Sequence, residues 1–284
     1  MIHKAEKNEE RKAMLKQLQE IAMNAGRLFS EKRPSRIEQK EGHANYVTNI
    51  DREVEDYLQA ALLDLVPGSG IIGEEKENEG LSDAPTWIVD PVDGTTNLIH
   101  DYRMSAVSIA LCESKKPVLG LIWQPYTREL FFAEKGRGAT LNGQPIHAAE
   151  TPFERALVTI GTSPYHPALA EKSMRIALDC LLSCADIRRS GSAAIDLACV
   201  ACGRLDAFFE LNLKPWDYAA GSLLIQEAGG CFSMPSLSGP PCYDLSTTIA
   251  ASSAVCADGF FSLLRSHLSN DSSPCRSTDQ HAVP

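Results

Sequence analysis

Apolar and polar positions along the chain follow one pattern before about residue 150 and another after it. In the first part, two segments with apolar residues at helical spacing precede short apolar runs separated by turn residues, which predict a meander of antiparallel strands. In the second part, strand-like and helix-like segments alternate, as in α/β proteins. We therefore predict an α/β (α+β) chain with an α+β lobe over residues 1–150 and an α/β lobe over residues 151–268.

The expected elements follow from this pattern and from the turn residues that separate its segments. Helices are expected at about residues 4–32, 52–65, 167–182, 193–202, 218–228 and 259–268. Strands are expected at residues 71–73, 87–89, 105–111, 117–123, 129–133, 156–161, 185–189, 205–211 and 249–251. The polar residues 37–45 predict a mobile loop or short hairpin, Asn142-Gly143 is a strong hairpin signal, and residues 269–284 are expected to be disordered.

The charge balance excludes some classes of protein. With 37 acidic and 27 basic residues the formal charge is -10, and no basic run stands out, so a nucleic-acid groove is not expected. No apolar stretch reaches about eighteen residues, which argues against a membrane span. The charged start, residues 1–11, has no apolar signal-peptide core. We expect a cytoplasmic protein.

Nine cysteines are scattered without the spacing of a disulfide framework, and we expect reduced thiols packed as small apolar residues. Cys199 and Cys202 form a C-x-x-C sequence, but they lie in a small, apolar segment that predicts a buried helix. No second Cys/His pair lies nearby in the sequence, so this pair is not expected to be a redox or zinc site.

The candidate chemistry is concentrated in residues 87–97. An apolar run leads into two carboxylates three residues apart, Asp90 and Asp93, and these are followed by Gly94 and Thr95. This composition is typical of a strand, a tight turn and the start of a helix. Two acids at the end of a strand, next to free amides at the start of a helix, can hold a cation against a phosphate.

Four other acids occupy comparable positions. Glu74 follows the apolar strand 71–73, and Glu210 ends an apolar run that begins at residue 205. Asp51 is expected in the first turn of a helix capped by Thr48 or Asn49, and Asp217 is expected at the N-cap of another helix. Capping alone would explain Asp51 and Asp217, so a chemical role for them requires further support.

That support comes from a resemblance. Three motifs, in this order, resemble the inositol monophosphatase family of magnesium-dependent, lithium-sensitive phosphomonoesterases: Gly73-Glu74-Glu75, Trp87-Ile-Val-Asp-Pro-Val-Asp-Gly-Thr-Thr-Asn97 and Trp216-Asp-Tyr-Ala-Ala-Gly221. Gly191-Ser-Ala-Ala-Ile-Asp196 and Glu227-Ala-Gly-Gly230 strengthen the match, which covers roughly residues 10–265. The resemblance implies a layered αβαβα sandwich, usually assembled as a homodimer, with a site between the lobes.

The resemblance also assigns roles to individual positions. The positions that match metal ligands are Glu74, Asp90, Val92 (through its carbonyl), Asp93 and Asp217. The positions that match the catalytic set are Glu74, Thr95 and Asp51, of which Thr95 and Asp51 would activate the attacking water. The positions that match substrate contacts are Asp93, Gly94, Thr95, Gly191, Ser192, Ala193, Glu210 and Asp217, and Lys40 matches a lysine of a mobile loop.

The implied cofactor is Mg²⁺, with two to three ions in each site. Magnesium prefers oxygen ligands, and a pair of ions can stabilise both the attacking and the leaving oxygen. Four carboxylates, from Glu74, Asp90, Asp93 and Asp217, would balance two divalent ions, so that a phosphate dianion could enter. The implied mechanism is in-line attack by a metal-activated water, without a covalent phosphoenzyme.

Three other classes of protein could carry acidic residues in a similar pattern. In haloacid-dehalogenase phosphatases the two aspartates are separated by one residue, whereas here Pro91 occupies the position that must be acidic. A calcium loop lacks an oxygen ligand at its third position and the glutamate at its twelfth. A non-catalytic binding or regulatory relative remains open, although every acidic position of the site is present.

We expect the substrate to be a small phosphorylated polyol or sugar, and inositol monophosphate is the first candidate. Fructose 1,6-bisphosphate, NADP or another sugar phosphate remain alternatives within the family. Asp93-Gly-Thr-Thr-Asn-Leu98 departs from the sequence typical of the nucleotide branch, and Glu210 can accept hydrogen bonds from hydroxyl groups. Tyr165, His166, Arg188 and Arg189 are expected near the substrate entrance, with roles that the sequence leaves undefined.

Overall fold

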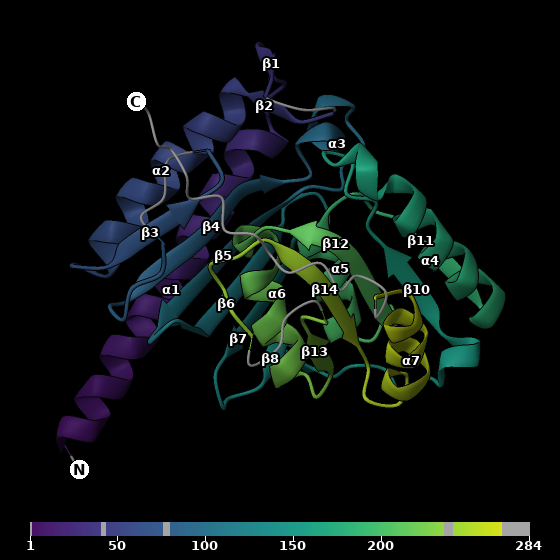
Figure 1. Ribbon diagram of the computed structural model, residues 1–284. Helices are drawn as coiled ribbons and strands as arrows, with labels where there is room; N and C mark the ends of the chain where they lie inside the picture. The colour runs from purple at the N-terminus through teal and green to yellow at the C-terminus, as the bar shows by residue number, and fades with distance from the viewer. Residues whose placement is uncertain (1, 41–43, 76–79, 236–240, 269–284) are drawn as a thin grey trace, which may run out of the picture.

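Five layers, helix–sheet–helix–sheet–helix, make up the protein in this computed structural model, which describes residues 2–40, 44–75, 80–235 and 241–268. Figure 1 shows α1 (Ile2–Ser30) and α2 (Asn49–Leu65) on one side of a large sheet, and α5 (Ala193–Ala201) and α6 (Pro215–Glu227) between that sheet and a smaller one. Helices α4 (Ala170–Ser183) and α7 (Ala257–Leu268) lie on the far side of the smaller sheet. This order agrees with the predicted αβαβα sandwich. Within the described residues, no helix is long and apolar enough to cross a bilayer.

The first two layers come from the N-terminal half. Helices α1 (Ile2–Ser30) and α2 (Asn49–Leu65) cover the large sheet, and β1 (Ile37–Gln39) pairs with β2 (Tyr46–Thr48) as a short antiparallel hairpin between them. The large sheet contains β3 (Gly70–Gly73), β4 (Thr86–Asp93), β5 (Ala106–Glu113), β6 (Lys116–Gln124), β7 (Glu129–Glu134), β8 (Ala139–Leu141) and β9 (Gln144–Ile146), in that order. From β4 onward every pairing is antiparallel, which confirms the predicted meander and the hairpin at Asn142-Gly143. The short helix α3 (Thr95–Ile99) follows β4.

The other layers come from the C-terminal half. The second sheet has the order β11 (Asp186–Arg188), β10 (Leu157–Ile160), β12 (Ala207–Leu213), β14 (Thr247–Ser252) and β13 (Cys231–Ser233). Its helices are α4 (Ala170–Ser183), α5 (Ala193–Ala201), α6 (Pro215–Glu227) and α7 (Ala257–Leu268), with short 3₁₀ turns at η1 (Phe153–Arg155) and η2 (Pro167–Leu169). Helices α5 and α6 pack against both sheets, whereas α4 and α7 contact each other and the outer face of the second sheet.

Three hydrophobic cores fill the spaces between the layers, because successive residues of a strand point to opposite faces. On β4, Trp87 and Val89 pack against α1 and α2, while Ile88 belongs to the central core with α5 and α6. On β12, Phe208 joins the same central core, and Phe209 packs toward α4 and α7. The central core therefore holds the two sheets together and places the ends of β4 and α6 near each other.

Some boundaries differ from the sequence-based predictions. Helix α2 begins at Asn49 rather than residue 52, and β12 runs from Ala207 to Leu213 rather than over the predicted residues 205–211. The three-residue strand β13 was not predicted, because it is too short to show an alternating pattern. The division near residue 150 stays a prediction, and the predicted disorder of residues 269–284 concerns residues outside the described ranges.

Candidate functional site

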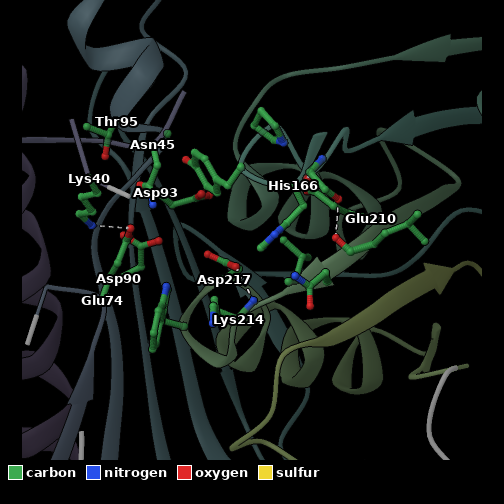
Figure 2. A pocket seen from close by; sticks show the side chains of 18 of the residues that line it. Lys40, Asn45, Glu74, Asp90, Asp93, Thr95, His166, Glu210, Lys214 and Asp217 are labelled. Carbon is green, nitrogen blue, oxygen red and sulfur yellow. Dashed lines mark hydrogen bonds and ion pairs between the residues drawn. The ribbon is translucent and has the colours of Figure 1, made fainter. Parts of the chain in front are cut away.

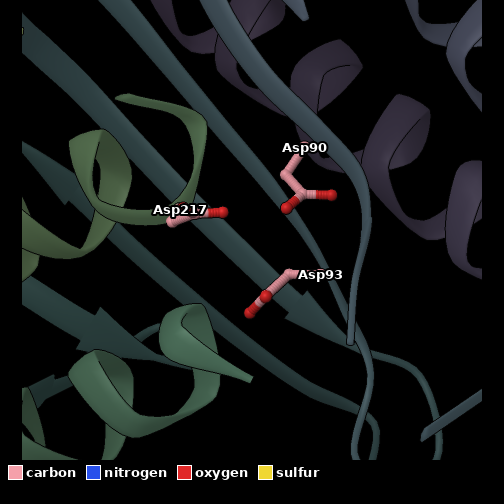
Figure 3. A group of neighbouring side chains, drawn as sticks. All are labelled: Asp90, Asp93 and Asp217. Atoms are coloured by element: carbon pink, nitrogen blue, oxygen red, sulfur yellow. The ribbon is translucent and has the colours of Figure 1, made fainter. Parts of the chain in front are cut away.

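Three aspartates from two different elements lie close together (Figure 3). Asp90 and Asp93 come from β4, and Asp217 comes from the first turn of α6. One carboxylate oxygen from each lies within 4.8 Å of the others, close enough to hold a metal ion together. The register of β4 against β5 shifts between Asp90 and Asp93, and such an irregularity lets both side chains turn to the same side.

Asp217 occupies a different helix position from the one predicted. Lys214 is the N-cap residue of α6, and Asp217 is the third residue of the first turn, where its Oδ2 accepts a 2.7 Å hydrogen bond from the Lys214 amide. The N-cap prediction was therefore wrong by three residues, although the carboxylate does satisfy a backbone amide at the helix start. Ser108 on β5 donates a 3.2 Å hydrogen bond to the Trp216 carbonyl, which ties this helix start to the large sheet.

Crowding of buried acids shifts their protonation. Burial raises the pKa of Asp90 well above its usual range, and the charges of Glu74, Asp93 and Asp217 add to the effect. Burial also raises the pKa of Asp217, with the nearby Asp93 and Glu74 contributing. For Asp93 burial raises the pKa to about 6, against the opposing hydrogen bonds from Ser192 and from backbone amides. A bound cation would remove this repulsion, so the donor set fits a divalent metal ion with hard oxygen ligands.

Glu74 lies at the edge of this cluster and pairs with a lysine. The Lys40 ammonium is 3.1 Å from Oε1 of Glu74 and 2.6 Å from Oε1 of Glu75, as Figure 2 shows for Glu74. Burial lowers the pKa of Lys40, but the two glutamates outweigh it, so the net pKa is raised and the lysine stays charged. Lys40 therefore neutralises part of the negative charge that surrounds the aspartates.

Thr95, the first residue of α3, contacts Asp51 directly. Its hydroxyl donates a 2.7 Å hydrogen bond to Oδ1 of Asp51, and it lies 3.2 Å from the Val92 carbonyl oxygen. Oδ2 of Asp51 accepts the Thr48 amide at 2.9 Å. Thr48, one of the two residues predicted as the N-cap, caps α2 and forms a capping box with Asp51. Because Asp51 is only 1% exposed, these contacts hold it rigidly behind Thr95.

Asp93 is bound from the other half of the chain. The Ser192 hydroxyl and the Ala194 amide donate hydrogen bonds of 2.5 and 2.7 Å to its Oδ2. Ser192 is also the N-cap of α5, where its oxygen accepts the Ile195 amide at 3.2 Å. The start of α5 therefore orients the carboxylate of Asp93.

Gly94 connects β4 to α3 in a conformation that favours glycine. Its φ is 95°, and a Cβ at this position would lie 2.8 Å from the Met104 carbonyl oxygen. Helix α3 spans only five residues, so the contribution of a helix dipole to binding an anion is small here. A phosphate at this position would depend more on individual amides and on the metal site than on the helix as a whole.

A cavity of about 550 Å³ opens beside the aspartates (Figure 2). Predicted site residues that line it are Lys40, Glu74, Asp90, Val92, Asp93, Gly94, Thr95, Glu210 and Asp217. A smaller adjoining cavity of about 70 Å³ is lined by Gly191, Ser192, Ala193, Arg189 and Glu210, among others. The structure therefore brings together every predicted site residue except Asp51, which lies behind Thr95.

Glu210 faces both cavities from β12. Its Oε1 accepts a 2.8 Å hydrogen bond from the Ser163 amide, and its carboxyl group crosses directly over Gly161. A Cβ at Gly161 would lie 2.0 Å from Cδ of Glu210, so only glycine leaves room for this side chain. Burial raises the pKa of Glu210 to about 7, against the opposing Ser163 hydrogen bond.

Some residues that line the cavity were not predicted from the sequence. Ser163 and Asn212, with φ values of 45° and 56°, adopt left-handed backbone conformations at the cavity wall. The local sequence gives no sign of these backbone conformations. Left-handed conformations at residues other than glycine often occur at functional sites. Lys214 also lines the cavity, and its place beside Pro215 and Trp216 could have indicated this.

Of the four residues expected near the substrate entrance, three line one of these two cavities and one lines neither. Tyr165 and His166 line the large cavity, and burial, together with the nearby acids, raises the pKa of Tyr165 so that its phenol stays protonated. Arg189 lines the smaller cavity, whereas Arg188 pairs with Asp186 on β11 at 2.5 Å. Among the described cysteines none forms a disulfide, and Cys199 ends up in α5, as predicted.

Comparisons of sequence agree with this arrangement. A sequence profile of the inositol monophosphatase family matches residues 8–269. Inositol monophosphatase 3 of Solanum lycopersicum is 37% identical over 255 residues, covering 86% of this chain and 94% of the relative. Nus factor SuhB of Escherichia coli (strain K12) is 35% identical over 254 residues, covering 88% and 94% of the two chains.

Solved structures are similar along nearly their whole length. An extragenic suppressor protein suhB of Bartonella henselae is 32% identical, with a TM-score of 0.80 over 91% of this chain and 99% of that one. An inositol monophosphatase from Anabaena (Nostoc) is 30% identical, with a TM-score of 0.79 over 90% and 96% of the two chains.

Proposed function

The chain belongs to the inositol monophosphatase family, and on that premise we propose that it hydrolyses inositol monophosphate to inositol and phosphate. The single observation that carries the proposal is the meeting of Asp90, Asp93 and Asp217 beside a cavity large enough for a sugar-sized ligand. Three carboxylates this close, two of them buried and one half-buried, repel one another, and a divalent cation is the simplest way to stabilise them.

Mg²⁺ is the cation that we propose, bound by Asp90, Asp93 and Asp217 with Glu74 at the edge of the cluster. When bound, it would supply positive charge to the phosphate oxygens and lower the pKa of coordinated water. The carboxylates contribute orientation and charge balance. The carbonyl of Val92, 3.2 Å from the Thr95 hydroxyl, is a further oxygen at the same turn.

Thr95 and Asp51 are proposed to take the proton from the attacking water. The Thr95 hydroxyl carries one hydrogen, which it donates to Asp51, so its lone pairs can accept a hydrogen bond from a water in the cavity. As the Thr95 oxygen accepts a proton from that water, Thr95 passes its own hydroxyl proton to Oδ1 of Asp51, which ends the step protonated. The water oxygen forms a bond to phosphorus while the bond from phosphorus to the ester oxygen breaks, without a covalent enzyme intermediate. The alcohol leaves as an alkoxide and takes up a proton from solvent water.

Polyol recognition is proposed for Glu210 and for the start of α5. Glu210 can accept hydrogen bonds from substrate hydroxyls through the oxygen that does not hold the Ser163 amide. Gly191, Ser192 and Ala193 line the adjoining cavity, where the alcohol part of the substrate would fit. Fructose 1,6-bisphosphate, NADP and other sugar phosphates are alternatives for the same site.

The test is Asp93→Asn measured with a substrate panel. Wild-type protein should release phosphate in a Mg²⁺-dependent reaction from at least one of inositol 1-phosphate, fructose 1,6-bisphosphate, NADP and histidinol phosphate, ranked by kcat/KM. Asp93→Asn should reduce that rate by about 100-fold or more, because a charged ligand is lost. Asp179→Asn changes a carboxylate that contacts His267 at 2.8 Å on the distant outer layer, and it serves as the matched control. Wild-type turnover by Asp93→Asn would refute the proposed site.

A second candidate function rests on the names of several relatives. Proteins named Nus factor SuhB are 35–41% identical to this chain, so a non-catalytic role as a factor of that kind is a candidate beside catalysis. It would gain support if no phosphate ester in the panel were hydrolysed while the purified protein still bound Mg²⁺. A homodimer and a cytoplasmic location also remain proposals.

A further inference from the structure

The carboxamide of Asn97 is enclosed between two glycines from opposite halves of the chain. Asn97 lies on α3 and is 8% exposed. A Cβ on Gly94 or on Gly191 would lie 3.2 Å from its amide nitrogen, so both backbones approach the carboxamide closely. Both glycines have positive φ values, 95° and 83°, which other residues rarely adopt.

This carboxamide connects the two halves by hydrogen bonds. Its Nδ2 donates to the Met104 carbonyl at 2.6 Å, just before β5, and to the Ser190 carbonyl at 3.1 Å, just before α5. The bond to Met104 joins residues that are 7 positions apart in the chain. The bond to Ser190 joins residues that are 93 positions apart and therefore connects the two halves. Asn97 therefore fixes the position of Ser190 relative to the turn that follows β4.

Ser190 in turn organises the short segment that leads to Ser192. Its hydroxyl accepts the Ser192 amide at 3.0 Å and donates to the Ser192 carbonyl at 3.1 Å. The segment 190–192 is thus held internally, and Asn97 is its hydrogen-bonded link to α3.

The far end of this segment reaches the acidic cluster. The Ser192 hydroxyl donates to Asp93 Oδ2 at 2.5 Å, and the Ala194 amide donates to the same oxygen at 2.7 Å. Any displacement of residues 190–192 would lengthen these bonds and rotate the carboxylate of Asp93. A continuous chain of hydrogen bonds therefore runs from Asn97 through Ser190 and Ser192 to Asp93.

We propose that Asn97 is a positioning residue, which holds the segment 190–192 so that Ser192 and Ala194 orient Asp93 for metal binding. Asn97 itself lines neither cavity and contacts no substrate in this scheme. The inference rests on the proposed function, because it treats Asp93 as a metal ligand. Residues that orient a metal ligand commonly change metal affinity by about 10- to 100-fold when they are replaced.

The experiment measures Mg²⁺ binding directly, by calorimetry and by the rise in Tm that Mg²⁺ produces. Asn97→Ala is expected to weaken Mg²⁺ binding by about tenfold or more. Ser192→Ala should give a loss of similar size, and the double variant should be little worse than either single one, because both act through the same contact to Asp93. Unchanged affinity in Asn97→Ala, or fully additive losses, would overturn the proposal.

The matched control is Asn142→Ala. The Asn142 side chain also bonds two backbone groups, the Leu130 amide at 2.9 Å and the Arg128 carbonyl at 3.2 Å, at the opposite edge of the large sheet. It should lower Tm without changing Mg²⁺ affinity, which separates general destabilisation from the proposed effect. If the wild-type protein binds no Mg²⁺, the proposed function fails. If the wild type binds Mg²⁺, and Asn97→Ala binds it with the same affinity while Ser192→Ala binds it more weakly, only the positioning role of Asn97 fails.

Discussion

The hydroxyl of Thr95 donates a 2.7 Å hydrogen bond to Oδ1 of Asp51, although 44 residues separate them in the chain. Asp51 is fixed by the capping box of α2, and Thr95 begins the helix that follows β4, the strand that carries Asp90 and Asp93. This contact therefore links the capped start of α2 to the proposed catalytic residue Thr95, and it leads to the first prediction.

Replacing Thr95 should separate proton transfer from metal binding. Thr95→Val keeps the shape of the side chain but removes its hydroxyl, so kcat should fall by about 100-fold or more, the range typical for general acid–base groups. Mg²⁺ affinity should change little, because the Thr95 side chain is uncharged and is hydrogen-bonded to Asp51 rather than to the three aspartates of the cluster. Thr95→Ser keeps the hydroxyl and should retain most activity. Equal kcat values for wild type and Thr95→Val would contradict the proposed role.

Glu210 should matter most for substrates with hydroxyl groups. Glu210→Gln removes the charge that strengthens its hydrogen bonds, so KM for inositol 1-phosphate should rise about tenfold. The effect should be much smaller for p-nitrophenyl phosphate, whose leaving group has no aliphatic hydroxyls. Steady-state kinetics with both substrates provide the comparison, and an equal loss on the two would point to a role in catalysis instead.

Gly161 provides an independent way to displace Glu210. A methyl group in Gly161→Ala would occupy the space 2.0 Å from Glu210 Cδ, so the carboxyl group must move. We expect KM for inositol 1-phosphate to rise as it does in Glu210→Gln. Gly70→Ala is the control, because a Cβ there would meet Thr86 at an ordinary 3.5 Å. Kinetics of Gly161→Ala that match those of Gly70→Ala would disprove the steric argument.

Stability without metal should fall as pH rises. Burial raises the pKa of Asp93 to about 6 and that of Asp196 and Glu210 to about 7, whereas carboxyl groups in an unfolded chain titrate near about 4. These carboxyl groups therefore bind protons more tightly in the folded state than in the unfolded state. The stabilisation of the folded state that results at pH 5 is lost as the pH rises through about 6–7. In EDTA, Tm should be about 5 °C or more lower at pH 8 than at pH 5.

Magnesium should reverse much of that loss. The carboxylates that repel one another at pH 8 become ligands, so Mg²⁺ should raise Tm more at pH 8 than at pH 5, where protons compete for the same oxygens. Thermal unfolding at both pH values, with EDTA or with saturating Mg²⁺, tests both statements. A Tm in EDTA that stays constant or rises between pH 5 and pH 8 would contradict the electrostatic picture of the cluster.

Lithium should inhibit phosphate release at a fixed Mg²⁺ concentration. Li⁺ is close to Mg²⁺ in size but has half its charge, so in the carboxylate cluster it would compensate less of the charge on the phosphate. Initial rates with increasing LiCl, compared with KCl at equal ionic strength, measure the effect. A complete absence of inhibition would place the chain in a distant branch of the family.

Local features of the fold were predictable because their causes lie within a few residues. The alternation of β4 sends Trp87 and Ile88 to opposite cores, and Thr48 caps α2 with Asp51 three residues later. Asn142-Gly143 turns the hairpin between β8 and β9. Errors arose where tertiary contacts extend an element: β12 was predicted to end at residue 211 but continues to Leu213, because it pairs with β14 that far.

By itself, the sequence determined the element types, the motif around Asp90 and Asp93 and, through resemblance, the candidate residues. Only the tertiary structure decided which of them touch. Asp93 and Ser192 are 99 residues apart, and their contact depends on the order of strands and on α5 and α6 packing between two sheets. Periodicity and turn chemistry act over a few residues, whereas these contacts follow from the packing of whole layers, which leaves no mark in the local sequence.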